Sequence, residues 1–227
     1  MRVLAIDTAL AACSAAVLDT EQDDLAASES LPMTRGHAEA LMPLVARVMD
    51  RSRVAFDALD RVVVTTGPGS FTGMRVGIAA ARGIALALKK PAVGLSTLSA
   101  FAGPYLTEDE TVPVVAVIDA RHGHVYLQVF GSGGRSVMGP RLAPLRDAIR
   151  AAAGAPARIV GSAAQSIAEA LGTTDATPVI VDARGAPDIA WVARMGATLP
   201  ANQSPPAPQY LRAPDAQPQN AAQLPRR

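Results

Sequence analysis

The sequence predicts an α/β protein built from two lobes. Short runs of β-branched and aliphatic residues alternate with stretches of helical period, and Gly and Pro separate them at short intervals. Hydrophobic residues make up 49% of the 227 residues and charged residues only 18%, so the chain can bury a sizeable core. We therefore expect a first lobe over residues 1–103, a smaller second lobe over 104–200 and a Pro-rich, largely extended tail over 201–227.

The first lobe is predicted to open with three antiparallel strands. Val3–Ile6, Ala15–Leu18 and Leu25–Leu31 are strand-like runs, and strands so close in sequence must form a meander. A helix should follow over His37–Met49, because its apolar residues fall on one face at helical spacing. Pro43 should start or kink a turn there.

Parallel crossover units are predicted next. Arg61–Thr66 is apolar on both faces, as in a buried strand, and it leads into a Gly-rich segment. An Ala-rich helix over Gly73–Leu88 and a short strand around Val93 complete the order β-β-β-α-β-α-β. This order resembles the ribonuclease-H-like lobe of actin and the sugar kinases, so we expect two actin-like lobes.

The second lobe is also predicted to be α/β. Its start is placed after Pro104, at the acidic stretch Glu108–Glu110. The expected strands are Val114–Ile118, Val125–Phe130, Arg158–Val160 and Val179–Val181, and the expected helices are Leu145–Ala153, Ala163–Leu171 and Ile189–Leu199. The last helix should pack back on the first lobe. In the tail, the pair Tyr210-Leu211 is expected to dock on the folded body.

Charge, cysteine content and hydropathy narrow the function classes. With 21 basic and 20 acidic residues spread along the chain, strong RNA binding by this chain alone is not expected. The single cysteine, Cys13, cannot form an internal disulfide and is expected to be a small buried residue in a cytoplasmic protein. No apolar run reaches the length that a bilayer requires, so we expect no membrane span and no export.

The segment from Thr65 to Gly77 is the sharpest local signal. Glycines at 67, 69 and 73 follow a strand and precede a helix, a context in which free N–H groups can face a phosphate. The spacing and lysine of a P-loop are absent, and a tight loop that only starts the helix is the alternative. The residues of this phosphate-facing loop hypothesis are Asp7, Thr8, Gly67, Gly69, Ser70 and Gly73.

Asp7 ends the first strand, where actin-like ATPases keep a carboxylate for metal-bound phosphate. The following turn lacks the glycines that approach phosphates in those enzymes, so nucleotide hydrolysis is not favoured, and a turn-capping role is equally compatible. His122 and His124 lie two residues apart and would share a strand face, but no acidic or Cys partner lies nearby. We expect surface histidines and no metal site.

The motifs together resemble one family, the bacterial TsaB proteins of threonylcarbamoyladenosine (t6A) tRNA modification, which are non-catalytic paralogues of the transferase TsaD. The stretches that carry the resemblance cover nearly the whole chain. They are Leu4–Thr8 with Ala12–Ser14, Arg35–Glu39 with Leu41–Leu44, Gly67–Gly77, Asp119–Arg121 with Val125-Tyr126, and Tyr210–Arg212. The Pro- and Gln-rich extension beyond Arg212 and the residues His122 and His124 depart from the family pattern.

The resemblance implies a scaffold rather than a catalyst. Two histidines at i, i+4 spacing hold a metal in the catalytic paralogue, and those positions are Thr97 and Phe101 here, so we expect no catalytic residues. The implied role is a cytoplasmic subunit that activates TsaD, joined by the ATPase TsaE, with tRNA bound only through the complex. No tightly bound cofactor is expected, although ADP or ATP at the subunit junction stays open.

The partner interface is predicted on the first lobe's helices. Small residues give the second helix a smooth face that another helix could approach, from within the lobe or from another chain. The interface residues are His37, Leu41, Leu44, Arg75, Gly77 and Ala81. The same face could pair with itself in a homodimer when the partner is absent. The alternative function is an enzyme, an actin-like ATP-dependent phosphotransferase or a metalloprotease-like protein.

Overall fold

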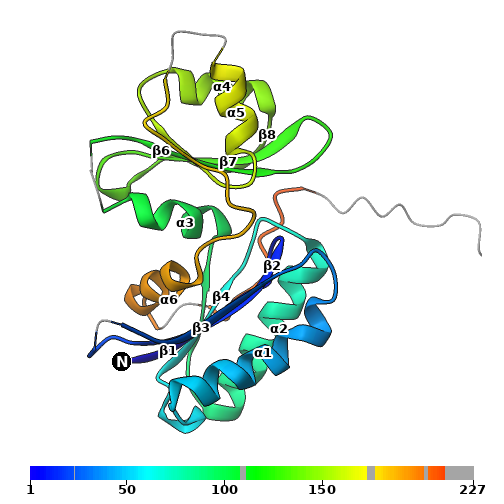
Figure 1. The fold of residues 1–227 in the computed structure, drawn as a ribbon, viewed down its shortest axis with the longest axis vertical. Helices are drawn as coiled ribbons and strands as arrows, with labels where there is room; N and C mark the ends of the chain where they lie inside the picture. The colour runs from blue at the N-terminus through cyan, green and yellow to red at the C-terminus, as the bar shows by residue number, and fades with distance from the viewer. Residues whose placement is uncertain (23, 108–110, 173–176, 202–203, 213–227) are drawn as a thin grey trace, which may run out of the picture.

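Two five-stranded mixed sheets form the frame of the protein in a computed structural model, which describes residues 1–22, 24–107, 111–172, 177–201 and 204–212 (Figure 1). Each sheet combines an antiparallel meander with parallel strands, and helices cover both of its faces. This is the predicted α/β architecture of two actin-like lobes. The predicted boundary at Glu108–Glu110 and the tail beyond Arg212 lie outside the described residues.

The first sheet has the order β3-β2-β1-β4-β5. Its strands are β1 (Arg2–Asp7), β2 (Ala12–Asp19), β3 (Asp24–Pro32), β4 (Arg61–Thr65) and β5 (Ala92–Leu95). The helices α1 (His37–Ser52) and α2 (Phe71–Leu88) cover one face. β1 pairs antiparallel with β2 and parallel with β4, and it is buried from Val3 onward because helices lie on both sides of the sheet.

The second sheet repeats the pattern with the order β10-β9-β6-β7-β8. Its strands are β6 (Val114–Asp119), β7 (His124–Phe130), β8 (Ser136–Pro144), β9 (Arg158–Val160) and β10 (Ile180–Asp182). The helices α4 (Leu145–Ala153) and α5 (Ala164–Leu171) pack on one face through an Ala-, Val- and Ile-rich core. β8 is not predicted from the sequence, because its residues are exposed or half-buried apart from Ala143 and lack a strict apolar alternation.

Two helices fill the space between the sheets. The last helix, α6 (Ile189–Thr198), packs on the first sheet, where the Val63 side chain occupies the space that a Cβ on Gly196 would need. The short helix α3 (Thr97–Ala102), which the sequence analysis did not predict, packs through Leu98 and Phe101 on the second sheet. α3 therefore lies between the two cores, because its Ala100 packs with the first sheet and α6 while Leu98 and Phe101 pack on the second sheet.

Cap residues set the bounds of the helices that border the site. Ser70 begins α2 by accepting a hydrogen bond from Gly73 N, and Lys89 ends it in the left-handed region. Gly36, with a φ of 83°, precedes α1. α1 is continuous from His37 to Ser52 with Pro43 inside it, so Pro43 does not start a separate turn, and burial of the apolar face holds the helix together across the proline.

One helix in the described part of the chain, α2, is long and apolar enough to cross a bilayer by length and composition alone. Its side chains Met74, Ile78 and Ala85 are buried against the first sheet. The apolar character of α2 therefore serves a core packing role in this fold.

Candidate functional site

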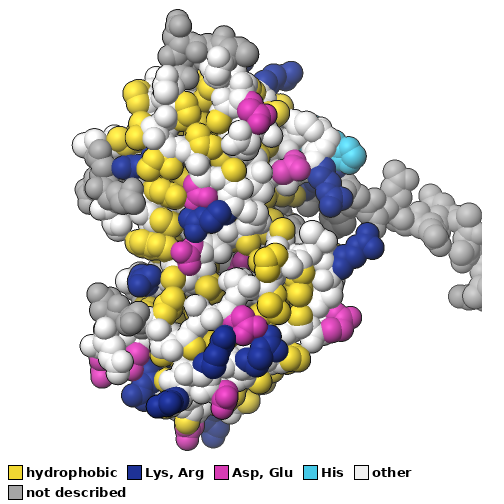
Figure 2. Space-filling model, viewed as in Figure 1, with side chains coloured by type: hydrophobic (Ala, Val, Ile, Leu, Met, Phe, Trp, Pro, Cys, Tyr) yellow, Lys and Arg dark blue, Asp and Glu magenta, His cyan; other side chains and the backbone are white. Residues whose placement is uncertain are grey.

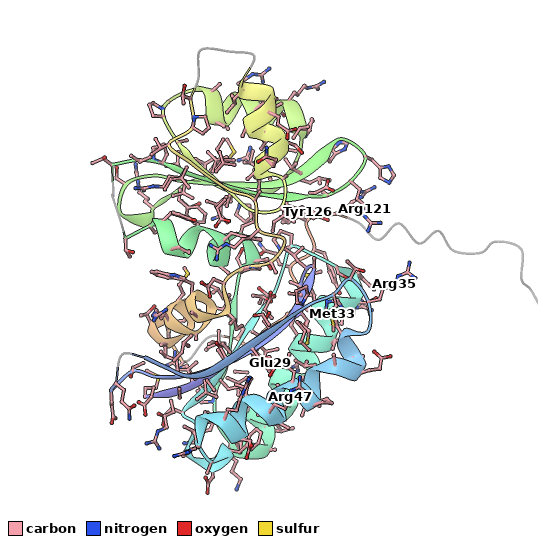
Figure 3. All side chains as sticks on the ribbon, viewed as in Figure 1. Glu29, Met33, Arg35, Arg47, Arg121 and Tyr126 are labelled. Carbon is pink, nitrogen blue, oxygen red and sulfur yellow. The ribbon has the colours of Figure 1, made fainter. Side chains whose placement is uncertain are left out.

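A cleft of about 660 Å³ lies between the lobes. The first lobe contributes the loop before α2 and the turn after β1, the second lobe contributes the turn after β6, and the segment 204–212 adds a third wall. The lining residues are Leu10, Ala11, Thr34, Pro68–Phe71, Met74, Asp119–His122, Tyr126 and Gln209–Arg212. Figure 3 shows Arg121 and Tyr126 on the second-lobe side of the cleft and Met33 and Arg35 on the first-lobe side.

The segment 204–212, here called the C-terminal strap, joins both lobes. Gln209 N donates to Thr66 O at 2.8 Å, and Arg75 Nε donates to Tyr210 Oη at 2.8 Å, both on the first lobe. Arg212 Nη1 reaches across to Ala120 O of the second lobe at 3.1 Å. The prediction that Tyr210 docks on the folded body is therefore confirmed.

An aromatic pair with an arginine forms the first-lobe rim of the cleft. The rings of Phe71 and Tyr210 stack with centroids 5.3 Å apart, and the Arg75 guanidinium lies 3.7 Å from the Phe71 centroid. Phe71 is 41% exposed and Tyr210 is 43% exposed, although both are large and apolar. Of the residues predicted for the partner interface, Arg75 is the exposed one, and here it is held by this stack.

The turn between β6 and β7 forms the opposite rim. Arg121, His122 and Gly123 follow one another with φ values of 62°, 52° and 71°. Asp119 holds the turn by accepting Arg121 N at 2.8 Å. The expectation that His122 and His124 share a strand face was wrong, because His122 lies in this left-handed turn and only His124 belongs to β7.

The Gly-rich loop packs on the turn after β1 rather than leaving its backbone open. A Cβ on Gly69 would overlap Ala9 O, and one on Gly73 would overlap Thr8 O, so these positions need glycine for close packing. Ser70 N donates to Ala9 O at 2.7 Å. These contacts agree with the alternative interpretation, a tight loop that starts a helix. Gly69 and Ser70 also line the cleft, so the phosphate-facing role of the loop stays a prediction.

Gly67 and Thr8 also make close packing contacts. Gly67 has a φ of 103°, and a Cβ there would overlap the Met74 sulfur. Thr8 is buried and donates its hydroxyl to Gly73 O at 2.7 Å. Neither residue lines the cleft, in contrast to Gly69 and Ser70 of the same candidate loop.

Asp7 is fully buried beneath the cleft rather than in it. Its Oδ1 accepts hydrogen bonds from Ala9 N, at 3.1 Å, and from the Thr65 hydroxyl, while Oδ2 has no hydrogen-bond partner in the structure. Burial raises the pKa of this carboxyl, and the bonds from Thr65 and Ala9 counter that effect only in part. The capping role left open for Asp7 agrees with its bond to Ala9 N.

The other predicted interface residues point into the lobe. Leu41, Leu44, Gly77 and Ala81 are buried in the core beneath α1 and α2. His37 is also buried, with Nε2 3.1 Å from Leu10 O. Their assignment to a partner interface is corrected: the helical period was read correctly, but the face that it marks is the one that packs on the first sheet.

The outward face of α1 and α2 consists of other residues. On α2, Ala79, Gly83 and Ala87 are exposed at helical spacing, and a Cβ on Gly83 would have no heavy atom within 4 Å. Leu86 beside them is 81% exposed. α1 also exposes small or apolar residues, Ala38, Met42, Pro43 and Ala46, with the charged residues Glu39 of α1 and Arg82 of α2 exposed among the two sets. We call these residues of both helices the outer helix face.

Thr97 and Phe101 lie one turn apart on α3 and are both buried. Among the residues that the structure describes, no three His, Cys, Asp or Glu side chains are grouped so that they could hold a metal ion.

These two lobes, joined at a cleft with the last helix returned to the first sheet, define a protein of the actin-like class. The family model described as TsaD, tRNA N6-adenosine threonylcarbamoyltransferase, matches residues 31–180. The chain belongs to this family, and within it to the TsaB or YeaZ type.

Relatives and solved structures agree with this placement. The chain is 37% identical over 126 residues to TsaB of Escherichia coli, covering 56% of this chain and 53% of that protein. It therefore spans about half the length of the first curated relatives it matches. An uncharacterized protein of Mycobacterium tuberculosis is 35% identical over 220 residues, 95% of this chain and 94% of its own.

A crystal structure from Pseudomonas aeruginosa, described as similar to peptidase YEAZ, superposes with a TM-score of 0.75 at 29% identity. The superposition covers 93% of this chain and 99% of that chain. The two-lobed fold is therefore shared over nearly the full described length.

Proposed function

We propose that this chain is a non-catalytic scaffold subunit that activates the transferase adding threonylcarbamoyl to N6 of the adenosine next to the anticodon in tRNAs reading ANN codons. The observation that carries this proposal is the outer helix face. Small exposed residues on α2 lie beside Arg82 and the exposed Leu86, and α1 exposes Met42, so this surface combines apolar residues with room for close approach by helices of another chain. The names of the TsaB relatives point to the same pathway.

Under this proposal the partner on the outer helix face is a transferase of the TsaD type, and an ATPase of the TsaE type joins the complex. Transfer RNA is modified by the complex, and the chain works in the cytoplasm. ADP or ATP, where it takes part, lies at the subunit junction, since the Gly-rich loop here is packed against the turn after β1. In the absence of the transferase, the outer helix face pairs two copies of this chain.

The residues at the positions of the transferase metal site support a non-catalytic role. Thr97 and Phe101 are buried side chains on α3. The hydroxyl of Thr97 and the ring of Phe101 cannot replace two histidine imidazoles as ligands of a metal ion. An ATP-dependent phosphotransferase or a metalloprotease-like enzyme remains the alternative. Asp7, the carboxylate that such a phosphotransferase would use, lies buried outside the cleft lining.

The experiment is a co-purification of the full chain with its transferase partner, followed by a t6A assay on tRNA. Gly83→Arg places a long charged side chain on the outer helix face and should abolish co-purification and t6A formation. Gly139→Arg, at an equally open glycine on β8 of the other lobe, is the matched control and should behave as wild type. Turnover of ATP with magnesium or of tRNA by the isolated chain would overturn the proposal.

A further inference from the structure

We propose that the interlobe cleft binds a single-stranded segment of RNA, with a phosphate at Arg121 and a base against the Phe71–Tyr210 pair. The inference rests on the proposed function only for the identity of the RNA, which would be the tRNA being modified. It assigns to this chain a direct contact with nucleic acid, in addition to its scaffold role.

The charge at the cleft differs from the balance of the whole chain. Arg121 is exposed on the second-lobe rim, and Arg35 is exposed beside the lining residue Thr34 on the first lobe. Across the described residues, neither guanidinium forms an ion pair. Asp119 is the one carboxylate among the lining residues, and its Oδ1 is occupied by Arg121 N. The rims of the cleft therefore favour an anion.

Figure 2 shows basic side chains of both lobes and a histidine on the right-hand edge of the molecule. In Figure 3, Arg35 and Arg121 project toward solvent on this same side. Two cations on facing rims suit a polyanionic strand that runs across the cleft. The adjacent phosphates of one free nucleotide would instead need a closed backbone cradle, and the Gly-rich loop is filled by Ala9.

The aromatic rim supplies the second requirement for binding a single strand. Phe71 and Tyr210 line the cleft and remain about two-fifths exposed, at 41% and 43%, so part of this aromatic pair is accessible from the cleft. Arg75 is fixed against both rings, which keeps a positive charge beside the site where a base would stack. Base stacking on aromatic rings together with nearby arginines is the usual way proteins hold unpaired nucleotides.

The C-terminal strap holds the two rims of the cleft in place. Tyr210 is anchored to the first lobe through Arg75, and Arg212 is anchored to Ala120, next to Arg121 on the second lobe. The strap therefore sets the distance between the aromatic rim and the cationic rim.

The test measures fluorescence anisotropy of a fluorescein-labelled decauridylate with the full chain across a series of low salt concentrations. Arg121→Asn removes the charge and tolerates the left-handed φ of 62°. It should weaken binding and reduce the slope of log K against log salt by about 0.7, the value for one phosphate on a single strand. Tyr210→Leu should weaken binding roughly tenfold, whereas Tyr210→Phe should keep most of it.

The control is Arg146→Asn, since Arg146 is 80% exposed on α4, which covers the other face of the second sheet. It should leave both the affinity and the slope unchanged. An absence of binding at low salt, an equal loss with Arg146→Asn, or displacement of the RNA by an equal concentration of free uridine monophosphate would each overturn the proposal. No partner subunit is present, so failure here is distinct from failure of the proposed complex.

Discussion

Gly77 of α2 lies directly against Thr8 at the end of β1. A Cβ on Gly77 would overlap Thr8 Oγ1 and would come within 3.4 Å of Val64 Cγ2. Thr8 cannot move away freely, because its hydroxyl donates to Gly73 O at 2.7 Å one turn earlier on α2. The helix therefore approaches the sheet at the distance that a glycine permits, and Gly77 is a residue of the core.

Gly77→Ala should lower the free energy of unfolding by about 1–3 kcal/mol, because the added methyl group has no room. Gly83→Ala, on the same helix with open space at its Cβ, should raise that free energy by up to about 1 kcal/mol through helix propensity. Urea denaturation of the two variants measures both effects. Equal stabilities would show that α2 sits further from the sheet than described.

Asp7 should make the protein less stable as the pH rises. Burial raises the pKa of Asp7 above its ordinary value of 3.8, so the folded state holds this proton more tightly than the unfolded state. The contribution of Asp7 is therefore most favourable below the unfolded pKa and is lost as the pH rises through the folded pKa. Asp7→Asn carries no such charge and can still accept from Ala9 N.

The measurement is the free energy of unfolding of wild type and Asp7→Asn between about pH 4 and pH 8. The difference should move in favour of the variant as the pH rises, while any fixed cost of the amide stays constant. A difference that is flat over this range, or that moves in favour of wild type, would contradict the buried and unpaired state of Oδ2.

The fold could be predicted because local patterns and tertiary packing agree over most of the chain. The run Arg61–Thr66 is apolar on both faces because helices cover both sides of β4, and the structure has a strand at Arg61–Thr65. By contrast, α3 is only six residues long, so its period is too short to recognise. β8 was also missed, since it is an exposed edge strand.

The site was harder to predict than the fold. Arg75 and Tyr210 are 135 positions apart, and no period or motif in the sequence indicates that a Pro-rich strap returns one to the other. For α2, the small residues correctly indicated close packing, but the sequence could not say on which side. Gly77 faces Thr8 and Gly83 faces solvent, and only the position of the sheet separates them.

Glu29 should have the opposite pH dependence to Asp7. Its carboxylate on β3 accepts from Arg47 Nη2 at 2.5 Å and from Arg51 Nη2 at 2.6 Å, where β3 meets α1 (Figure 3). The hydrogen bond from Arg47 is the main cause that lowers the pKa of Glu29 below 4.5. Its contribution to stability is therefore present above pH 4.5 and is lost as the pH falls through the folded pKa.

Glu29→Gln should lower the melting temperature at neutral pH, and the difference from wild type should shrink in acid and at high salt, because the arginines are exposed. Asp50→Asn is the matched control, since Asp50 is an exposed carboxylate on α1 that forms no ion pair in the described part of the chain. A difference that persists unchanged at acid pH would show that the two arginines do not act through the Glu29 charge.

Cys13 should be inert in the native protein. Its side chain is buried in the first-lobe core, and burial, followed by the nearby Asp7 charge, raises the pKa of the thiol to about 11. Almost no thiolate exists at pH 8, and reagents reach it only when the lobe opens. Ellman's reagent should therefore react with Cys13 only after denaturant is added. In the variant Ala153→Cys, whose new thiol lies exposed at the end of α4 and away from the outer helix face, one equivalent should react at once in the native state and the second only on unfolding. Two fast equivalents would contradict the burial of Cys13. The reagent would then have reached a side chain that the closed first lobe covers.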